Sequence, residues 1–271
     1  MTKVITTHIQ KGGVGKTTIT FNNAYYLAVK KNQRVLLIDF DESLNLSKRF
    51  KKQLVERIDK IPIESTVYAF FSGITPKPIN VDKNIDIIVG HDQLYTLAEK
   101  VKEGRGKAYL IAWYYANKEM IEANYDYILI DTHNDFSVFV HNALAFADKI
   151  ISIVDVDEDA IDMLTKEEVQ LEKLKNDLIN PMTNESFVDA KIIKIGNKIP
   201  HNTKDARLFK AKFEEMMQVD PNFLGYFESR VDFGKTKTDR KPLTQLEAES
   251  KDNKKIAFYE RTWTLFDKIN A

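Results

Sequence analysis

Eight residues near the start of the chain read Lys11-Gly12-Gly13-Val14-Gly15-Lys16-Thr17-Thr18, and they follow the apolar run 4–9. Glycines let the backbone turn its N–H groups inward around phosphate oxygens, and a lysine at position 16 of this pattern reaches the β- and γ-phosphates. The Thr17 hydroxyl is placed to bind Mg²⁺. The stretch therefore predicts a phosphate-binding loop between a buried strand and a helix.

One departure from the usual pattern is informative. The common form, G-x-x-x-x-G-K-[ST], has glycine at the position of Gln10, and here a second lysine, Lys11, opens the loop. This is the deviant, two-lysine form of the motif. The alternative, a glycine-rich basic turn that binds nothing, rarely produces this spacing after an apolar strand.

Composition limits the classes of protein to consider. The chain has 271 residues, 43% of them hydrophobic, which suits one large core, and we expect a single P-loop domain over residues 1–271 without a DNA-binding domain before the loop. Lys+Arg and Asp+Glu both number 40, so no global field attracts polyanions. Cysteine is absent, which excludes disulfides, thiolate zinc sites, Cys-ligated iron–sulfur clusters and a cysteine nucleophile.

Short apolar runs alternate with segments of helical periodicity. Such β-branched runs are typical of strands buried on both faces of a parallel sheet, and their alternation with helices predicts an α/β fold with a doubly wound, mostly parallel sheet flanked by helices. Helices are expected at 19–31, 161–178 and 256–269, and the region 225–244 is expected to be irregular and polar. The predicted strands are 4–9, 35–38, 85–89, 127–130, 150–154 and 191–195.

Acidic residues follow two of these strands. Asp39 and Asp41 come after the second run, and Asp131 comes after the fourth. Ligands of open parallel sheets lie outside the carboxyl ends of the strands, so these acids are expected to converge on the phosphate loop. Asp131, with Thr17, is the predicted Mg²⁺ partner; Asp39 is a weaker candidate ligand, and Asp41 could orient an attacking water. An isolated acid in this position is more often a cap or a turn residue.

Taken together, three segments resemble the ParA/MinD group of deviant-Walker ATPases, and most closely the ParA branch that partitions plasmids and chromosomes. The resemblance is strong over about the first half of the chain and weak afterwards. The segments are Lys11 to Thr18, Arg34-Val35-Leu36-Leu37-Ile38-Asp39-Phe40-Asp41 and Tyr125-Asp126-Tyr127-Ile128-Leu129-Ile130-Asp131-Thr132.

The resemblance implies a set of roles. ATP and Mg²⁺ would be the cofactors, and Lys11 would be the signature lysine that crosses an ATP-dependent homodimer to the partner's phosphates. Lys16 and Thr17 would serve the chain's own nucleotide, and Asp41 would support hydrolysis. Asn197, after the last predicted strand, falls where the family often has an adenine-reading asparagine, although such a residue alone is usually part of a turn.

The chain departs from the family in two loops. Glu42 and Ser43 replace the common Pro-Gln after Asp41, and His133 and Asn134 stand where Pro-Pro is usual. These changes affect expectations for hydrolysis rate and partner coupling more than those for ATP binding. A slow nucleotide-dependent recruitment switch therefore stays open as an alternative.

ParA relatives bind nonspecific DNA as ATP dimers, and a ParB-like centromere-binding adaptor stimulates their hydrolysis. The resemblance thus implies a cytoplasmic, nucleoid-associated protein. A solvated charged face is the alternative for each basic residue on its own, because phosphate contacts need only local positive charge. The candidate DNA-binding residues are Arg207, Lys210, Arg230, Lys235, Lys237 and Arg240, with Lys212 and Lys241 nearby.

The main rival is a MinD-like ATPase that binds the membrane through a basic amphipathic C-terminal helix. Aromatic residues recur at helical spacing in 256–269, but Glu260 and Asp267 dilute the positive charge, so core packing is favoured and membrane binding is not expected. A biosynthetic ligase with a similar loop is also open. Lone histidines show no metal-ligand spacing and are interpreted as structural.

Overall fold

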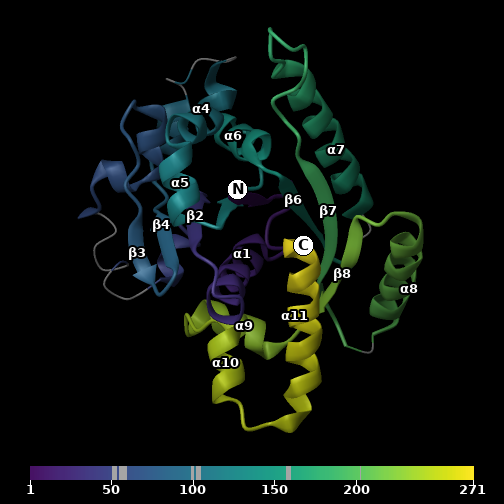
Figure 1. Cartoon of the computed structure of the whole chain (residues 1–271). Coiled ribbons are helices and arrows are strands. Elements are labelled where there is room, and N and C mark those ends of the chain that lie inside the picture. Colours follow the sequence, from purple (N-terminus) through teal and green to yellow (C-terminus); the bar gives the residue numbers. More distant parts are fainter. Residues whose placement is uncertain (51–53, 55–59, 99–100, 102–104, 157–159, 202) are drawn as a thin grey trace.

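The computed structural model describes residues 1–50, 54, 60–98, 101, 105–156, 160–201 and 203–271. At its centre lies an eight-stranded sheet in the order β3-β4-β2-β5-β1-β6-β7-β8 (Figure 1). Neighbouring strands run parallel except β3, which pairs antiparallel with β4 at one edge. The strands are β1 Lys3–Thr7, β2 Val35–Phe40, β3 Ile79–Asp82, β4 Ile85–Ile88, β5 Tyr127–Thr132, β6 Lys149–Val154, β7 Lys191–Ile199 and β8 Phe223–Glu228.

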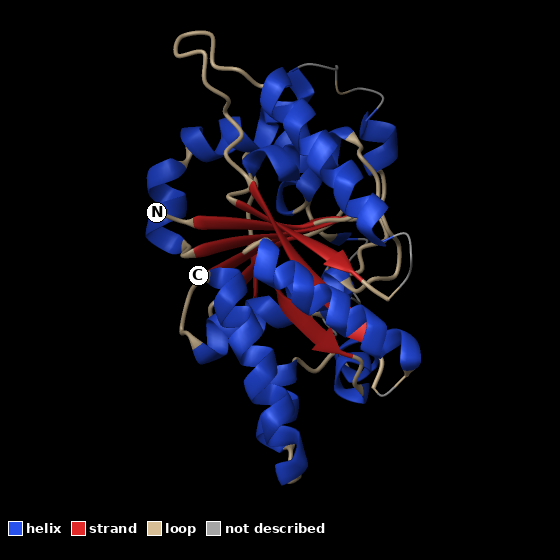
Figure 2. Ribbon diagram, turned by 90° about the vertical axis from the view of Figure 1, so that its right-hand side faces the viewer, coloured by secondary structure: helices blue, strands red, loops and turns tan. Residues whose placement is uncertain are grey.

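Helices cover both faces of this sheet (Figure 2). The α-helices are α1 Lys16–Tyr25, α3 Leu94–Ala98, α4 Tyr109–Ala116, α5 Lys118–Asn124, α6 Val138–Phe146, α7 Ala160–Asp177, α8 Lys204–Val219, α9 Val231–Thr238, α10 Leu243–Glu249 and α11 Ile256–Asn270. A π-helical turn, η1 Tyr26–Lys30, extends α1. Short 3₁₀ segments are η2 Ser47–Arg49, η4 Ile63–Ser65, η5 Val67–Phe71, η6 Arg105–Ala108 and η7 Asn253–Lys255.

Successive strand residues enter two different hydrophobic clusters. In β2, Leu36 and Ile38 belong to a cluster that includes residues of η5, α4, α5 and α6, whereas Leu37 belongs to a cluster that includes residues of α1, α8 and α11. All three side chains are fully buried. Because both faces are covered, the strands are near-continuous apolar runs rather than alternating ones. The predicted doubly wound α/β fold is confirmed, with all six predicted strands and the three predicted helices in place.

The expectation of an irregular region at 225–244 is wrong. This region contains the end of β8, all of α9 and the start of α10. Strand β8 lies at the sheet edge, where several of its residues are only half buried, and Gly225 has a φ of 145°. An edge strand needs less apolar surface than a central one, so its sequence signal is weak. Strand β3, at the opposite edge, lacks a clear sequence signal for the same reason.

The C-terminal helix α11 packs its apolar stripe into the core. Phe258, Leu265 and Phe266 are buried, and the Tyr26 ring stacks on the rings of both Phe266 and Trp263, with centroid distances of 5.4 Å. Apart from Ile256, which is exposed, the stripe is therefore not available for a membrane surface, which weakens the MinD-like alternative. In the described part of the chain, no helix has the length and apolar character needed to cross a membrane.

Candidate functional site

The predicted phosphate loop joins β1 to α1 at the carboxyl edge of the sheet. Gly13 and Gly15 have φ values of 77° and 105°, which glycine adopts readily and other residues rarely do. Helix α1 begins at Lys16, and neither a side-chain cap nor an acidic residue occupies its first turn. The backbone N–H groups at this helix start therefore suit an anion.

Asn197, on β7, fixes the conformation of this loop. Its side-chain amide donates a hydrogen bond of 2.7 Å to the carbonyl oxygen of Val14. A Cβ atom on Gly15 would lie 2.4 Å from the Asn197 amide nitrogen, so a larger residue at position 15 cannot be accommodated without a shift. The contact explains why the third glycine of the loop is needed.

Lys16 is buried and bonded to the loop itself. Its Nζ donates to the carbonyl oxygens of Lys11, at 3.0 Å, and Ile9, at 3.4 Å. Burial lowers the pKa of Lys16, while the negative charges of Asp131 and other carboxylates act in the opposite direction. The ammonium group thus lies at the base of the loop with neutral partners that an anionic ligand can replace.

Asp131, the last but one residue of β5, is fully buried. Among the described residues, neither of its carboxylate oxygens has a partner with good hydrogen-bond geometry, and the Thr17 hydroxyl is close enough to act on it as a donor. Burial raises the pKa of Asp131, and the neighbouring Asp39, its register partner on β2, raises it further. The nearby Thr17 hydroxyl and the positive charge of Lys16 favour the ionised form. A buried carboxylate without well-formed hydrogen bonds is costly, and a bound cation would satisfy it.

The structure does not support the prediction that Asp39 is a metal ligand. One oxygen accepts hydrogen bonds from the Ser47 hydroxyl, at 2.6 Å, and the Ser47 N–H, at 2.8 Å, and the other accepts from the Asp41 N–H at 3.2 Å. The Ser47 hydroxyl in turn accepts from the Gly90 N–H at 3.1 Å. Burial raises the pKa of Asp39 despite these donors. Its carboxylate is thus committed to holding the loop after β2.

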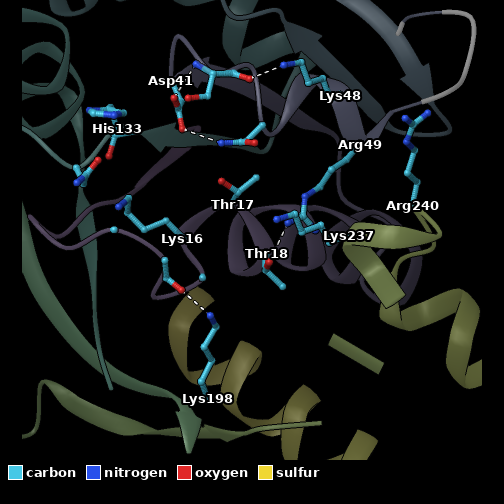
Figure 3. Close-up of a pocket in the computed structure, with 17 residues that line it drawn as sticks. Lys16, Thr17, Thr18, Asp41, Lys48, Arg49, His133, Lys198, Lys237 and Arg240 are labelled. Atoms are coloured by element: carbon cyan, nitrogen blue, oxygen red, sulfur yellow. Dashed lines mark hydrogen bonds between the residues drawn. The ribbon is translucent and has the colours of Figure 1, made fainter. Parts of the chain in front are cut away.

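Asp41 lies in that loop and lines the cavity over the phosphate loop. Its carboxylate accepts hydrogen bonds from the Ser43 N–H at 2.9 Å and from the Asn45 amide at 3.4 Å. These contacts orient the carboxylate beside the phosphate loop (Figure 3). The position suits a group that holds a water molecule near a phosphate.

The cavity over the phosphate loop has a volume of about 500 Å³ and a strongly positive wall (Figure 3). Besides the loop, it is lined by residues that follow β2 and β5 and by residues of β7 and the end of α9. Six described lining residues are cationic and one, Asp41, is a carboxylate, so the cavity favours a polyanion. The cations are Lys16, Lys48, Arg49, Lys198, Lys237 and Arg240.

A second cavity, of about 470 Å³, adjoins the first. Its walls include Asn197, Arg230 and Phe233. Four residues line both cavities and mark the place where they join, namely Gly15, Thr18, Lys198 and Lys237. One extended ligand with an anionic part and a less polar part fits this pair of cavities.

Lys11 does not line either cavity. Its Nζ lies 2.7 Å from Oδ1 of Asp155, just after β6, and both side chains are about one-fifth exposed. In this arrangement the second lysine of the loop contacts its own chain. Its predicted role across a dimer stays a prediction.

The six predicted DNA-binding residues differ in their surroundings. Lys237 and Arg240 are exposed and also line the phosphate cavity, and their contact with DNA stays a prediction. Lys210 and Arg230 both pair with Glu228, at 3.0 and 3.1 Å, and Arg230 also lines the second cavity. Arg207 is exposed on α8, and Lys235 is half-buried on α9.

Several cavity residues had no sequence signal. Lys48 and Arg49 follow the second predicted strand by many positions, and Lys198 stands beside Asn197 without a motif of its own. The Lys198 Nζ donates to the Gly13 carbonyl at 2.6 Å. His133, interpreted as structural from the sequence, in fact lines the phosphate cavity. In the described part of the chain, no cluster of His, Cys, Asp and Glu forms a metal site on its own.

Comparison with known proteins finds a matching family model and several related sequences. The sequence model of the AAA domain family matches residues 2–196. The chain is 26% identical over 264 residues to an uncharacterized protein of Methanocaldococcus jannaschii, with 95% of each chain covered. It is 29% identical over 178 residues to the sporulation initiation inhibitor protein Soj of Bacillus subtilis, which covers 61% of this chain and 63% of Soj.

Solved structures show the same fold. A plasmid partition protein from Borrelia burgdorferi matches with a TM-score of 0.72 at 22% identity, with 99% of this chain and 98% of that chain covered. The ATP complex of a Cyanothece McdA variant matches with a TM-score of 0.74 at 18% identity, with 99% and 95% covered. Since the family model spans most of the sequence, the chain belongs to the AAA domain family.

Proposed function

We propose that this protein is a Mg²⁺-dependent ATPase of the ParA type. The observation that carries the proposal is the buried Asp131 carboxylate, which has no well-formed hydrogen bond among the described residues and lies near the Thr17 hydroxyl at a phosphate-binding loop. The ATP in the complex of the McdA variant supports the choice of nucleotide.

The residues present fit a magnesium ion. Thr17 supplies a hydroxyl and Asp131 a carboxylate, and Mg²⁺ prefers one or two such ligands beside phosphate oxygens and water. When bound, the ion would neutralise charge on the β- and γ-phosphates. Asp39 is left out of this assignment because its oxygens accept hydrogen bonds from Ser47 and Asp41.

The chain's own groups account for the other steps of phosphoryl transfer to water. The N–H groups of the loop bind and orient the phosphates, and Lys16 exchanges its two carbonyl partners for phosphate oxygens. Asp41 holds the attacking water, since its carboxylate is fixed by Ser43 and Asn45 at the cavity wall. Positioning and charge neutralisation supply most of the catalysis in such reactions.

The second cavity is proposed to hold the nucleoside. It joins the phosphate cavity at Thr18 and Lys198, and Asn197 lies in its wall with an amide group that already bonds Val14. The Asn197 side chain can thus read a base edge while its amide nitrogen keeps the loop in place.

We further propose that ATP binding joins two copies of the chain. In the joined state Lys11 leaves Asp155 and contacts the phosphates of the other copy. A partly exposed ion pair contributes only about 0–1 kcal/mol, so this contact does not prevent the change. Hydrolysis then separates the copies.

Nonspecific DNA binding by the ATP-bound dimer is the proposed output, with a ParB-like adaptor that accelerates hydrolysis. Soj and the B. burgdorferi plasmid partition protein give this proposal its context. Arg207 and Arg230 are exposed outside the phosphate cavity, whereas Lys237 and Arg240 are exposed and line it. The localisation that follows is cytoplasmic and nucleoid-associated.

The first experiment measures binding to random-sequence DNA with ATP, with ADP and without nucleotide, over a range of salt concentrations. ATP-selective binding that weakens steeply with salt is expected. The Arg207→Gln variant should bind DNA more weakly. The Arg34→Gln variant serves as the control, because the Arg34 guanidinium pairs with Asp126. ATP-dependent binding to anionic liposomes in place of DNA would contradict the proposal. ATP binding without turnover would indicate the slow recruitment switch instead.

A further inference from the structure

Arg49 is a buried cation whose contacts with described residues are all with neutral groups. Its side chain is 8% exposed, and its nitrogens donate to two hydroxyls, Thr18 Oγ1 at 2.9 Å and Thr236 Oγ1 at 3.2 Å. The guanidinium carbon lies 5.4 Å from the centre of the Phe21 ring. Among the described residues, no carboxylate lies within 4.0 Å of its nitrogens. Neutral partners only partly replace the water that a guanidinium loses on burial.

The electrostatics of the site agree with this geometry. Burial lowers the pKa of Arg49 to about 10, and the negative charge of Asp131 acts in the opposite direction without contact. Breaking or omitting one partner of a buried charge pair is strongly destabilising, so buried arginines are normally paired. Arg49 lines the phosphate cavity, where an anionic ligand can supply the missing charge.

The position of Arg49 identifies which part of a nucleotide would do so. Lys16 and Asp41 mark the end of the cavity that receives the terminal phosphates, and the second cavity receives the nucleoside. Thr18, to which Arg49 is bonded, lines both cavities. The α-phosphate connects the nucleoside to the other phosphates, so it must lie at this junction. Lys237 lines the junction from α9.

We propose that Arg49 and Lys237 bind the α-phosphate of the nucleotide. This inference rests on the proposed nucleotide-binding function and adds two residues that the phosphate-loop motif does not contain. Arg49 also bonds Thr236, so the α-phosphate links the loop after β2 to helix α9. Both residues are binding residues that do not take part in the chemical step.

The test compares the binding of ADP and ATP to the wild-type chain, Arg49→Gln, Lys237→Gln and the control Arg34→Gln by isothermal titration calorimetry. Loss of one charge-assisted contact corresponds to about 10- to 100-fold in affinity. Arg49→Gln should weaken ADP and ATP by the same factor, because both carry the α-phosphate. Lys237→Gln should weaken both by a smaller common factor, since its side chain is exposed, and Arg34→Gln should weaken neither.

A second readout uses the two diastereomers of ADPαS, in which sulfur replaces one or the other α-phosphate oxygen. The wild type should prefer one diastereomer, and the preference should shrink in Arg49→Gln because the discriminating donor is gone. Lys237 is exposed, so Lys237→Gln should fold normally. It provides the test of α-phosphate binding if Arg49→Gln fails to fold.

Three results would overturn the inference. A loss of affinity for ATP alone would assign the two residues to the γ-phosphate. The other two results are an unchanged diastereomer preference in Arg49→Gln and unchanged nucleotide affinity in both variants. A wild-type chain that binds neither nucleotide would overturn the proposed function, and this inference with it, whereas normal wild-type binding with unaffected variants overturns the inference alone.

Discussion

Replacement of Ser47 by alanine tests how the loop after β2 is held. The Ser47 hydroxyl donates to the buried Asp39 carboxylate at 2.6 Å and accepts from the Gly90 N–H at 3.1 Å. A hydrogen bond to a charged group contributes about 1.5–3 kcal/mol, and a buried N–H left without an acceptor costs about 1–3 kcal/mol. Because the two effects share one hydroxyl and are not additive, we expect a loss of about 2–4 kcal/mol in the free energy of unfolding.

The loss should depend on pH. Burial raises the pKa of Asp39, and the bonds from Ser47 act against this rise. The hydroxyl therefore stabilises the ionised carboxylate in particular. Its removal should cost more at pH 8 than at pH 6, where a larger share of Asp39 is protonated in the folded state.

The assay is urea-induced unfolding of the wild type, Ser47→Ala and Ser43→Ala at both pH values. Ser43 lies in the same loop, is exposed, and has no described hydrogen bond through its hydroxyl, so it is the matched control. A Ser47→Ala loss below about 0.5 kcal/mol, the range of an ordinary surface substitution, would refute the account of Asp39 as the residue that holds this loop. An equal loss at both pH values would refute the inference that the Ser47 hydroxyl stabilises the ionised form of Asp39.

Other expected outcomes concern the site directly. Lys11→Ala should spare nucleotide binding by the single chain but lower ATP turnover to a basal rate, and normal turnover would exclude a role across a dimer. Asp41→Ala should keep ATP binding and reduce the turnover number by about 10²- to 10⁴-fold, the range of a lost general base, as a phosphate-release assay would show. Gly15→Ala should lower stability by at least about 1–2 kcal/mol from the left-handed backbone and weaken nucleotide binding further by displacing Asn197; calorimetry of both quantities checks this. Because burial raises the pKa of Asp131, the folded state retains a proton that the unfolded state has lost, so the melting temperature without ligand should fall as pH rises from about 5 to about 8. Mg²⁺ with nucleotide should offset that fall, and a flat profile would be evidence against a raised pKa.

The central sheet could be predicted because each of its inner strands is buried on both faces. Residues such as Leu36 and Leu37 enter different clusters, yet both are apolar, so the run is visible in the sequence. Strands β3 and β8 could not be found in this way, since edge strands carry half-exposed residues. Their place in the sheet depends on pairing with β4 and β7, which are separate runs in the sequence.

The phosphate loop could be predicted because its chemistry is local. Eight consecutive residues contain the glycines, the lysine and the hydroxyl, and no distant contact is needed to recognise them. Arg49 differs, because its burial depends on Thr236, 187 positions away. The carboxylates can be recognised as a group, and the sequence ranks Asp131 above Asp39 as a ligand without showing what Asp39 does instead. The hydrogen bonds from Ser47 show that the Asp39 carboxylate holds the loop after β2. The Asp131 carboxylate has no such bonds among the described residues.

The joined cavities also bear on how the chain acquires its binding site during synthesis. A ribosome that has not yet passed α9 has already made the whole phosphate loop and most of the parallel sheet, but Thr236 and Lys237 do not yet exist. Domains generally fold as units, so a sheet that needs contacts with α9 is completed only once α9 has been made. A nascent chain would therefore expose Arg49 without its α9 partner, and nucleotide would reach its full stabilising effect only after α9 has been made.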